Sequence, residues 1–227
     1  MQFFRLNQTK VACITSKSLV PYQEALDFMS KRVDMIINGT ANPLIWLLEH
    51  VPIYTAGAMT LSEDLISPKI PVISTNRGGR CTYHGPGQRV LYIMLDLGDM
   101  YHEKPDIKDF ILRISQLLIN ILKNIGVIAF CSAQGTGVWI RNKNVEEKIC
   151  SIGVKVKKWV TSHGVAVNIS PDLTKFDDII PCGIQNCRMT SLEKLGKNIT
   201  ISEFDSIIIK EFKNLFNCEC YYEESFI

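Results

Sequence analysis

Apolar residues recur at steps of three and four along three stretches of the chain, and this spacing predicts three amphipathic helices. The first runs from Pro21 to Asn38, where the proline suits a first helical turn and the glycine that follows suits a stop. The second runs from Pro105 to Ile125 and is the longest. The third begins with the spacing of a capping box, Thr200 to Glu203, and continues to Leu215.

Shorter apolar or alternating runs predict strands between these helices. They cover 2–15, 44–48, a short run ending at 57, 72–74, 90–97, 127–131, 137–141, 149–156 and 160–169, the last two forming a hairpin around 157–159. The segments 58–71 and 170–181 are predicted loops. Strands and helices are intermixed without a regular βαβα alternation. We therefore predict an α+β fold, with a mixed, largely antiparallel sheet that carries helices on one side.

The length and charge of the chain limit the classes of protein to which it can belong. A chain of 227 residues fits one domain, which we take as 1–227. The net charge is +2 and only Lys155–Lys158 approaches a basic patch, so no nucleic-acid partner is expected. Charged residues interrupt the apolar runs of the first segment, and no later run reaches the roughly 18 apolar residues of a membrane span. We expect a cytoplasmic protein that has no contact with membranes.

The sequence contains eight cysteines. A chain of this size with a good core and no export signal belongs in a reducing compartment, so we read them as free thiols. Cys182 with Cys187, and Cys218 with Cys220, match the spacing of structural zinc ligands poorly. No metal site is expected.

The stretch from Asn76 to Leu97 has the composition of a binding site. It holds four glycines, three arginines and a Tyr-His pair directly before an apolar strand. Glycine allows the backbone to approach a ligand closely, while arginine, histidine and tyrosine supply fixed hydrogen-bond donors. Two glycine clusters flanking Thr82–His84 favour a ligand site over an ordinary hairpin loop.

Among the cysteines, Cys182 is the candidate nucleophile, because it lies between Pro181 and Gly183 at the end of a polar loop. A free thiol has a pKa of about 8.5, so attack requires a nearby cation or base. His84, His163 and Lys148 could each fill that role. Their spacing along the chain does not decide among them.

Five blocks of the sequence, in this order, resemble the signature of octanoyltransferases of lipoate biosynthesis, the lipoate-protein ligase B type. The blocks are RGGRCTYHGPGQ (77–88), GVW (137–139), KICSIGVKV (148–156), HGVAVNI (163–169) and PCGIQNCRMTSL (181–192). The resemblance implies a single catalytic domain, monomeric, with a biotin/lipoate protein ligase-like fold. It also implies transfer of an octanoyl group from acyl carrier protein, through a cysteine thioester, to a lysine ε-amine. The acceptors would be lipoyl domains of 2-oxoacid dehydrogenases and the glycine-cleavage H protein.

Carried over residue by residue, the resemblance makes Cys182 the acyl-thioester nucleophile and Lys148 the cation that favours its thiolate. The matching substrate-binding residues are Arg77, Gly78, Gly79, Arg80, Cys81, Thr82, Tyr83, His84, Ser151, Ile152, Gly153, Gly164, Val165 and Ala166. We expect backbone N–H groups of Ser151–Gly153 and Gly164–Ala166 to face the acyl carbonyl. A thioester is already activated, so no cofactor is expected. Glu146 and Glu147 are close enough in sequence that either could pair with Lys148.

Other interpretations remain open. An ATP-dependent lipoate or biotin protein ligase would share the fold but need no cysteine nucleophile. A cysteine hydrolase would pair Cys182 with His84 or His163, and a binding module would not react at all. We also expect Arg77, Arg80, Arg89 and Lys155–Lys158 to help dock the acidic acyl carrier protein.

Overall fold

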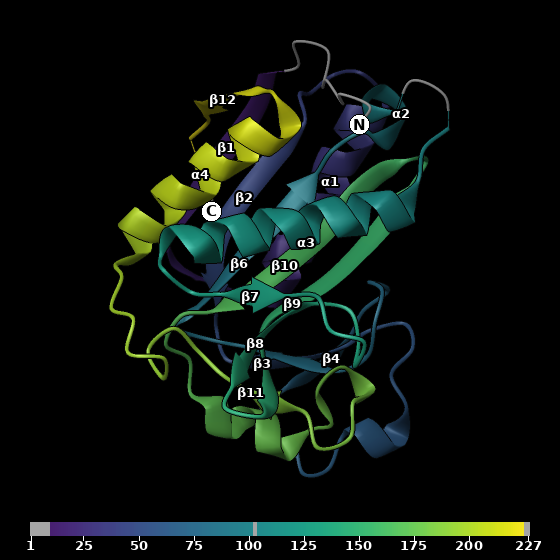
Figure 1. Cartoon of the computed structure of the whole chain (residues 1–227). Coiled ribbons are helices and arrows are strands. Elements are labelled where there is room, and N and C mark those ends of the chain that lie inside the picture. The colour runs from purple at the N-terminus through teal and green to yellow at the C-terminus, as the bar shows by residue number, and fades with distance from the viewer. Residues whose placement is uncertain (1–9, 102–103, 225–227) are drawn as a thin grey trace.

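The structure is a computed structural model that describes residues 10–101 and 104–224 (Figure 1). Its strands are β1 (Lys10–Val20), β2 (Leu44–His50), β3 (Ile53–Ala56), β4 (Val72–Ser74), β5 (Thr82–His84), β6 (Gln88–Met94), β7 (Ala129–Phe130), β8 (Val138–Asn142), β9 (Val145–Lys157), β10 (Val160–Asn168), β11 (Arg188–Met189) and β12 (Glu219–Tyr222). Its helices are α1 (Tyr22–Ile37), α2 (Leu97–Met100), α3 (Ile107–Asn124) and α4 (Ile201–Phe216). Short 3₁₀ turns are η1 (Ser62–Asp64), η2 (Leu173–Asp178) and η3 (Pro181–Gly183).

A nine-stranded sheet forms the centre of the molecule, in the order β12-β1-β2-β6-β10-β9-β8-β7, with β11 pairing beside β9. The pairs β12–β1, β1–β2 and β11–β9 are parallel, and the other pairs along this order are antiparallel. The predicted α+β class and largely antiparallel sheet are therefore confirmed. The predicted hairpin is also confirmed, since β9 and β10 turn at Lys158 and Trp159, which both have positive φ.

The helices cover both faces of this sheet, so the expectation of helices on one side was wrong in that detail. In Figure 1, α3 and α4 lie in front of the sheet and α1 lies behind it. Successive β1 residues point to opposite faces: Val11 and Cys13 pack in the core with α3 and α4, while Ala12 and Ile14 pack in the core with α1. Strand β2 is apolar at consecutive positions, which is typical of a strand covered on both faces.

The three predicted helices are present, and local capping explains their ends. The capping box of α4 joins Thr200 and Glu203 in both directions. The side chain of Asp106 accepts hydrogen bonds from Lys108 N and Asp109 N, which starts α3 at Ile107 rather than at Pro105.

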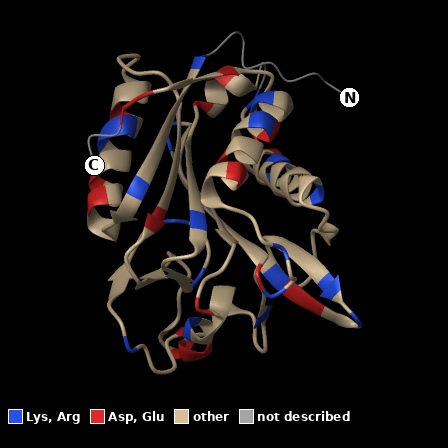
Figure 2. Cartoon of the chain, turned by 90° about the vertical axis from the view of Figure 1, so that its left-hand side faces the viewer, with Lys and Arg blue, Asp and Glu red and all other residues tan. Residues whose placement is uncertain are grey.

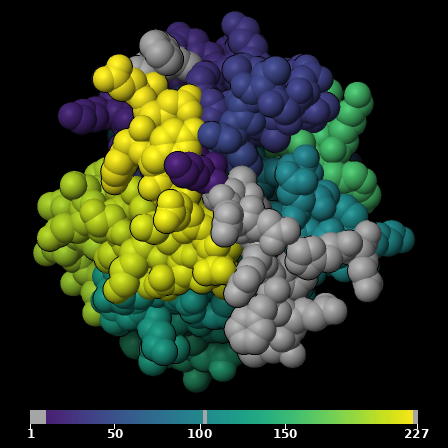
Figure 3. Space-filling model, turned by 90° about the horizontal axis from the view of Figure 1, so that it is seen from above, coloured from purple at the N-terminus to yellow at the C-terminus, as the bar shows by residue number. Residues whose placement is uncertain are grey.

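The edge of the sheet differs from the sequence prediction. Strand β1 continues to Val20, and residues 2–9 of the predicted opening strand lie outside the described residues. We did not predict β12, which pairs in parallel with β1. Seen from above, C-terminal atoms in yellow adjoin N-terminal atoms in purple (Figure 3), in agreement with this pairing.

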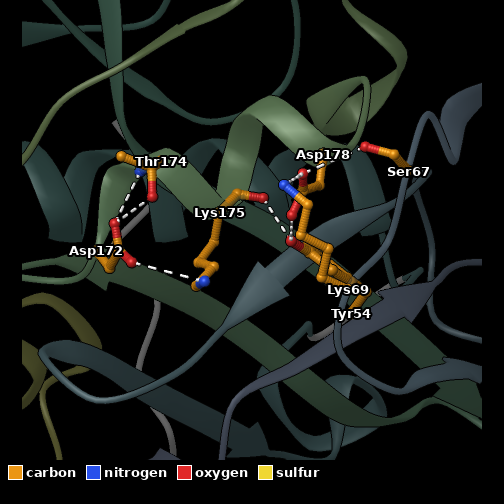
Figure 4. A network of polar contacts seen from close by, with 7 residues as sticks. All are labelled: Tyr54, Ser67, Lys69, Asp172, Thr174, Lys175 and Asp178. Atoms are coloured by element: carbon orange, nitrogen blue, oxygen red, sulfur yellow. Dashed lines mark hydrogen bonds and ion pairs between the residues drawn. The ribbon is translucent and has the colours of Figure 1, made fainter.

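A small sheet, β4-β3-β5, lies beneath the large one and carries part of the glycine-rich stretch. Asp178 ties the small sheet to the loop that leads to Cys182 (Figure 4). Its carboxylate accepts a hydrogen bond from Tyr54 at 3.0 Å and lies 3.3 Å from Lys69 Nζ. The backbone N–H groups of Ile66 and Ser67 donate to its carbonyl oxygen. The end of this loop is thus fixed before the chain reaches Cys182.

Lysine and arginine are interspersed with aspartate and glutamate over the molecule (Figure 2). All eight cysteines are free. Across residues 10–101 and 104–224, no helix is both long enough and apolar enough to cross a lipid bilayer.

Candidate active site

The side chains of Lys148 and Cys182 meet, although they lie 34 positions apart in the sequence. Lys148 projects from β9 and is fully buried, and its Nζ lies 3.2 Å from the Cys182 sulfur. The same Nζ donates a hydrogen bond of 2.7 Å to the carbonyl oxygen of Thr136. Ser151 Oγ approaches the sulfur to 3.9 Å. A buried amine is therefore in direct contact with a half-buried thiol.

Cys182 is held in a left-handed backbone conformation, with φ 57° and ψ 15°. Its N–H donates a 2.8 Å hydrogen bond to the carbonyl oxygen of Cys81, and the N–H of Gly183 donates to Ile180. A Cβ on Gly183 would lie 2.2 Å from Arg80 Cδ, so only glycine fits beneath that arginine. Such a backbone in a non-glycine residue costs roughly 1–3 kcal/mol and is often found at functional sites.

The GVW block shapes the other side of Lys148. The ammonium lies 5.3 Å from the centre of the Trp139 ring. A Cβ on Gly137 would lie 2.6 Å from Lys148 Cε and 2.5 Å from the carbonyl oxygen of Cys150. Gly137 is thus required for the lysine to pass, a role that sequence reasoning missed. In the sequence, only the resemblance of the GVW block to the family signature pointed to Gly137.

Neither of the glutamates that could have paired with Lys148 does so. Glu146 lies 2.7 Å from Arg141, and Glu147 lies 3.0 Å from Lys194. Along a strand, adjacent side chains point to opposite faces, so Glu147 cannot share a face with Lys148.

A cavity of about 220 Å³ opens beside the Cys182 sulfur. The predicted site residues that line it are Arg77, Gly79, Arg80, Thr82, His84, Ser151, Ile152, Gly153, Gly164, Val165, Ala166 and Cys182. Tyr22, Val90 and Tyr92, which we did not predict, also contribute walls. Lys148 lies behind the wall, where its Nζ contacts two lining residues, Thr136 and Cys182.

Three of the predicted substrate-binding residues, Gly78, Cys81 and Tyr83, lie outside the lining. Gly78 N–H donates to the carbonyl oxygen of Val154, which fastens the glycine-rich loop across β9. Cys81 and Tyr83 belong to the buried cluster under the small sheet, where Tyr83 packs edge-on against Phe176.

Two of the three arginines expected in the docking surface are buried, so that expectation was wrong for Arg77 and Arg89 and stays a prediction for Arg80. Arg77 is buried and donates to the backbone and hydroxyl oxygens of Thr55. Arg89 is 2% exposed and pairs with Asp205 at 2.6 Å. Arg80 pairs with Asp64 at 2.6 Å. These guanidinium groups are already engaged within the protein.

The expected arrangement of backbone donors is also wrong in part. Residues Gly164–Ala166 of β10 pair with β6 on one edge and with β9 on the other. In an antiparallel sheet with both edges paired, the N–H groups are used by the ladder. This segment therefore contributes a wall to the cavity, and its N–H groups are not directed at a ligand.

The two histidines considered as partners of Cys182 are buried and neutral. Burial lowers the pKa of His163 to about 3 and holds the pKa of His84 well below its usual range. Within the described chain, the polar contacts of the Cys182 sulfur are with Lys148 and Ser151, and neither histidine is among them. The three candidates left open by the sequence thus reduce to Lys148.

A chain of buried hydrogen bonds connects His84 to the strand that carries Lys148. His84 Nδ1 lies 2.7 Å from Gln88 Oε1, and Gln88 Nε2 donates to Asn168 Oδ1. Asn168 Nδ2 then donates to the carbonyl oxygen of Thr190, whose N–H donates to the carbonyl oxygen of Lys148.

The neighbouring thiols differ from Cys182. Burial raises the pKa of Cys81 and of Cys187 to about 11, and it raises the pKa of Cys150 further. These thiols stay protonated near neutral pH. Among the residues that the structure describes, no three His, Cys, Asp or Glu side chains gather in a way that could hold a metal ion.

A family described as the lipoyl protein ligase A/B catalytic domain matches residues 21–213, which is most of the chain. The chain belongs to this family. Relatives within it include the octanoyltransferase of Anaplasma phagocytophilum, 44% identical over 202 residues that cover 88% of this chain and 96% of the relative. The octanoyltransferase of the Wolbachia strain from Culex pipiens is 41% identical over 203 residues, covering 89% and 98%.

Solved structures of two protein ligases have a similar fold. The bipartite lipoate protein ligase of Thermoplasma acidophilum superposes with a TM-score of 0.70 at 15% identity, covering 96% of this chain and 87% of that one. The biotin protein ligase of Aquifex aeolicus superposes with a TM-score of 0.52 at 13% identity, covering 91% and 70%. The expected biotin/lipoate protein ligase-like fold is confirmed.

Proposed function

We propose that this protein transfers an octanoyl group from acyl carrier protein, through a thioester on Cys182, to the ε-amine of a lysine on a lipoyl domain. The names of its relatives support octanoyl transfer. The observation that carries the mechanism is the 3.2 Å contact between Lys148 Nζ and Cys182 Sγ at the wall of the cavity. We expect the reaction to take place in the cytoplasm, where the thiol stays reduced.

In the first half of the reaction, Lys148 as an ammonium stabilises the Cys182 thiolate. The thiolate attacks the carbonyl carbon of the donor thioester, and a new C–S bond forms as the bond to the phosphopantetheine sulfur breaks. The departing thiolate takes a proton from Lys148. This half ends with acyl-Cys182, a free donor thiol and a neutral lysine.

In the second half, the ε-amine of the acceptor lysine attacks the acyl carbon of Cys182. Neutral Lys148 takes the proton that the attacking nitrogen loses, and the C–S bond breaks to release the amide. Cys182 is again a thiolate beside an ammonium. Protons balance over the cycle, and because the donor is already activated, ATP is not consumed.

Lys148 is placed to take part in both halves of the reaction. Its Nζ donates to the Thr136 carbonyl oxygen and contacts the Cys182 sulfur, and its side chain is completely buried. The apolar part of the cavity, including Val90, Ile152 and Val165, would bury the acyl chain at up to about 0.8 kcal/mol per methylene.

Mixing the protein with octanoyl-acyl carrier protein and measuring its intact mass tests the proposal. We expect one octanoyl adduct on the peptide that contains Cys182, no adduct on a Cys182→Ala variant, and transfer to a lipoyl domain without ATP. Transfer that requires ATP and survives in Cys182→Ser would establish a ligase instead. Release of free octanoate without transfer would establish a hydrolase.

A further inference from the structure

The carbonyl oxygen that accepts from Lys148 Nζ belongs to Thr136, and Thr136 lies on the loop 132–136 between β7 and β8. Connecting loops are more mobile than the strands that they join, so such a carbonyl stays in place only where other contacts hold the loop. One contact comes from Trp139 Nε1, which donates to the carbonyl oxygen of Gly135 at 3.1 Å. Trp139 and Lys148 are paired across β8 and β9, so both contacts lie on the same face of the sheet.

Glu146 holds the first half of this loop. Its carboxylate accepts hydrogen bonds from Ser132 Oγ and, at 3.1 Å, from Gln134 Nε2. The backbone N–H of Gln134 donates to Ser132 Oγ at 3.0 Å, which joins the two loop residues to each other. Arg141 Nη2 donates to the other carboxylate oxygen at 2.7 Å. Every side chain that contacts this carboxylate is a donor, so the arrangement requires an acceptor at position 146.

Glu146 also shares a face of β9 with Lys148. The two residues are two positions apart along the strand, or roughly 7 Å. Glu147 lies between them, points to the opposite face and contacts Lys194 at 3.0 Å. Arg141 is the cross-strand partner of Glu146 and contacts it, as shared facing requires. One face of β9 therefore presents a carboxylate that holds the loop and, next to it, an amine that contacts a carbonyl oxygen of the same loop.

The Glu146 side chain is a carboxylate at neutral pH. The hydrogen bonds from Ser132 and Arg141 lower the pKa of Glu146 below its usual range. Hydrogen bonds to a charged acceptor are stronger than those between two neutral groups. The attachment of the loop at Ser132 is therefore firm over the pH range in which a thiolate could form on Cys182.

Resting on the proposed octanoyl transfer, we propose that Glu146 is a positioning residue, which holds the loop 132–136 so that the Thr136 carbonyl oxygen meets Lys148. While Lys148 is an ammonium, this carbonyl fixes its Nζ against the Cys182 sulfur. When Lys148 is neutral, the carbonyl engages one N–H and leaves the nitrogen lone pair for the proton of the attacking amine. Without the carboxylate, the first half of the loop is released and the carbonyl has no fixed place.

The main test removes the carboxylate and follows the thiol directly. In Glu146→Ala, alkylation of the Cys182 peptide by iodoacetamide should reach half its maximal rate at a pH roughly one unit higher than in the wild type, because the ammonium beside the thiolate loses a fixed acceptor. The kcat of octanoyl transfer should fall about tenfold, the effect of one hydrogen bond to a charged group, and KM for the donor should stay within about twofold. An unchanged alkylation profile would overturn the proposal, whatever happens to kcat.

The conservative variant Glu146→Gln separates the hold on the loop from the charge. Its amide keeps one oxygen for Ser132 and Gln134 and turns its nitrogen toward Arg141, whose side chain is 63% exposed and is free to move into solvent. We expect an alkylation profile and a kcat close to those of the wild type. A Glu146→Gln variant that behaves like Glu146→Ala would mean that the charge acts on Lys148 directly, and it would contradict the positioning role.

Glu147→Ala is the matched control, since it removes the neighbouring carboxylate and its contact with Lys194 from the opposite face of the same strand. This variant should be less stable than the wild type but should keep the wild-type alkylation profile of Cys182. A shift as large as that of Glu146→Ala would contradict the proposal. If Glu146→Ala does not fold, Ser132→Ala takes its place, because it removes one loop hydrogen bond and should shift the profile in the same direction by a smaller amount.

The alkylation assay requires no acyl donor, so it tests the positioning role separately from the reaction. Absence of an octanoyl adduct on Cys182 of the wild type would refute the proposed function. An octanoyl adduct on the wild type, together with the wild-type alkylation profile in Glu146→Ala, would refute only the positioning role.

Discussion

The two ends of the cavity differ in how their polar groups are satisfied. At the thiol end, Lys148 Nζ contacts both a carbonyl oxygen and the Cys182 sulfur. The other end, which we call the ring end, is lined by the buried side chains of Tyr22, Arg77, His84, Tyr92 and His163. Three polar atoms there, Tyr22 OH, Arg77 Nε and His163 Nδ1, have no hydrogen-bond partner among the described residues and almost no accessible surface. The thiol end thus holds its reacting groups in contact, whereas the ring end holds buried rings.

The two ends also differ in charge. A lysine that can be charged lies against a sulfur at the thiol end, whereas burial and the nearby Arg77 charge keep His163 neutral at the ring end. Neutral histidines of this kind do not exchange protons near neutral pH. The predictions below test this division, starting with the change expected to matter most.

Replacing Lys148 tests the thiol end most severely. Lys148→Met should reduce transfer to the lipoyl domain by roughly 10³-fold, the usual contribution of a general acid and base. Lys148→Arg keeps a cation but cannot give up its proton. That variant should form acyl-Cys182 more slowly, because the donor thiolate must leave without a proton from residue 148. It should then fail to pass the acyl group on, so the adduct accumulates in single-turnover mass spectrometry. Turnover near the wild-type rate in Lys148→Arg would exclude a proton-transfer role.

A substitution that displaces Lys148 without replacing it should reduce activity less than Lys148→Met does. In Gly137→Ala, the new methyl would lie 2.6 Å from Lys148 Cε, at a φ of 134°. We expect roughly a 100-fold loss of kcat and a loss of about 1–3 kcal/mol in the free energy of unfolding, typical of overpacking. Gly196→Ala is the matched control, since Gly196 has a φ of 70° but nothing within 4 Å of the new Cβ. The free energy of unfolding of Gly196→Ala should fall by about 1–2 kcal/mol from backbone strain alone, with no change in kcat.

The neutral histidines predict acid sensitivity of the fold. Burial lowers the pKa of His50 to about 4 and of His163 to about 3, below the unfolded value of about 6.5. A lowered pKa stabilises the fold above pH 6.5, and this contribution is lost as the pH falls toward the folded values. Between pH 7 and pH 5, the free energy of unfolding in urea should fall by up to about 2 kcal/mol per histidine.

The His50→Gln variant checks the origin of that slope. One titrating group fewer should make the fall between pH 7 and pH 5 shallower, even if the variant is less stable throughout. A stability that is flat over this range in the wild type would mean that the buried histidines bind protons in the folded state.

The smallest effect concerns the lysines that remain from the predicted docking surface. Lys157 already pairs with Asp34 at 2.6 Å. Reversing Lys155 and Lys158 to glutamate should raise KM for acyl carrier protein about threefold at low salt, with little change in kcat. Reversing Lys210 and Lys213 on α4 makes the same change in net charge and should have no effect. A KM that does not depend on salt would exclude this surface.

Local patterns predicted local structure well. The three helices were found from their spacing and caps, and the β9–β10 hairpin from its two apolar runs. The four residues of β12 carry too little pattern to be recognised, and their stability comes from pairing with β1. Helices on both faces of the sheet follow from chain topology, which residue spacing does not encode.

The site was also predictable only where the signal in the sequence is local. Proline and glycine on either side of Cys182 singled it out as the candidate nucleophile, but they did not predict its positive φ. The choice of Lys148 over two histidines needed either a family resemblance or the fold. Arg89 was misassigned because its partner, Asp205, lies 116 residues away, and sequence alone does not reveal a tertiary ion pair.

The buried chain from His84 to Thr190 sets the orientation of each amide along it. A backbone carbonyl only accepts, so Thr190 requires the amide nitrogen of Asn168, which leaves Asn168 Oδ1 for the nitrogen of Gln88. Gln88 Oε1 then requires a hydrogen on His84 Nδ1. The Thr190 carbonyl oxygen, three hydrogen bonds away, thereby selects the tautomer of the His84 imidazole. In this tautomer Nδ1 carries the hydrogen and Nε2 has a free lone pair. The ¹⁵N chemical shifts of the ring would reveal this arrangement directly.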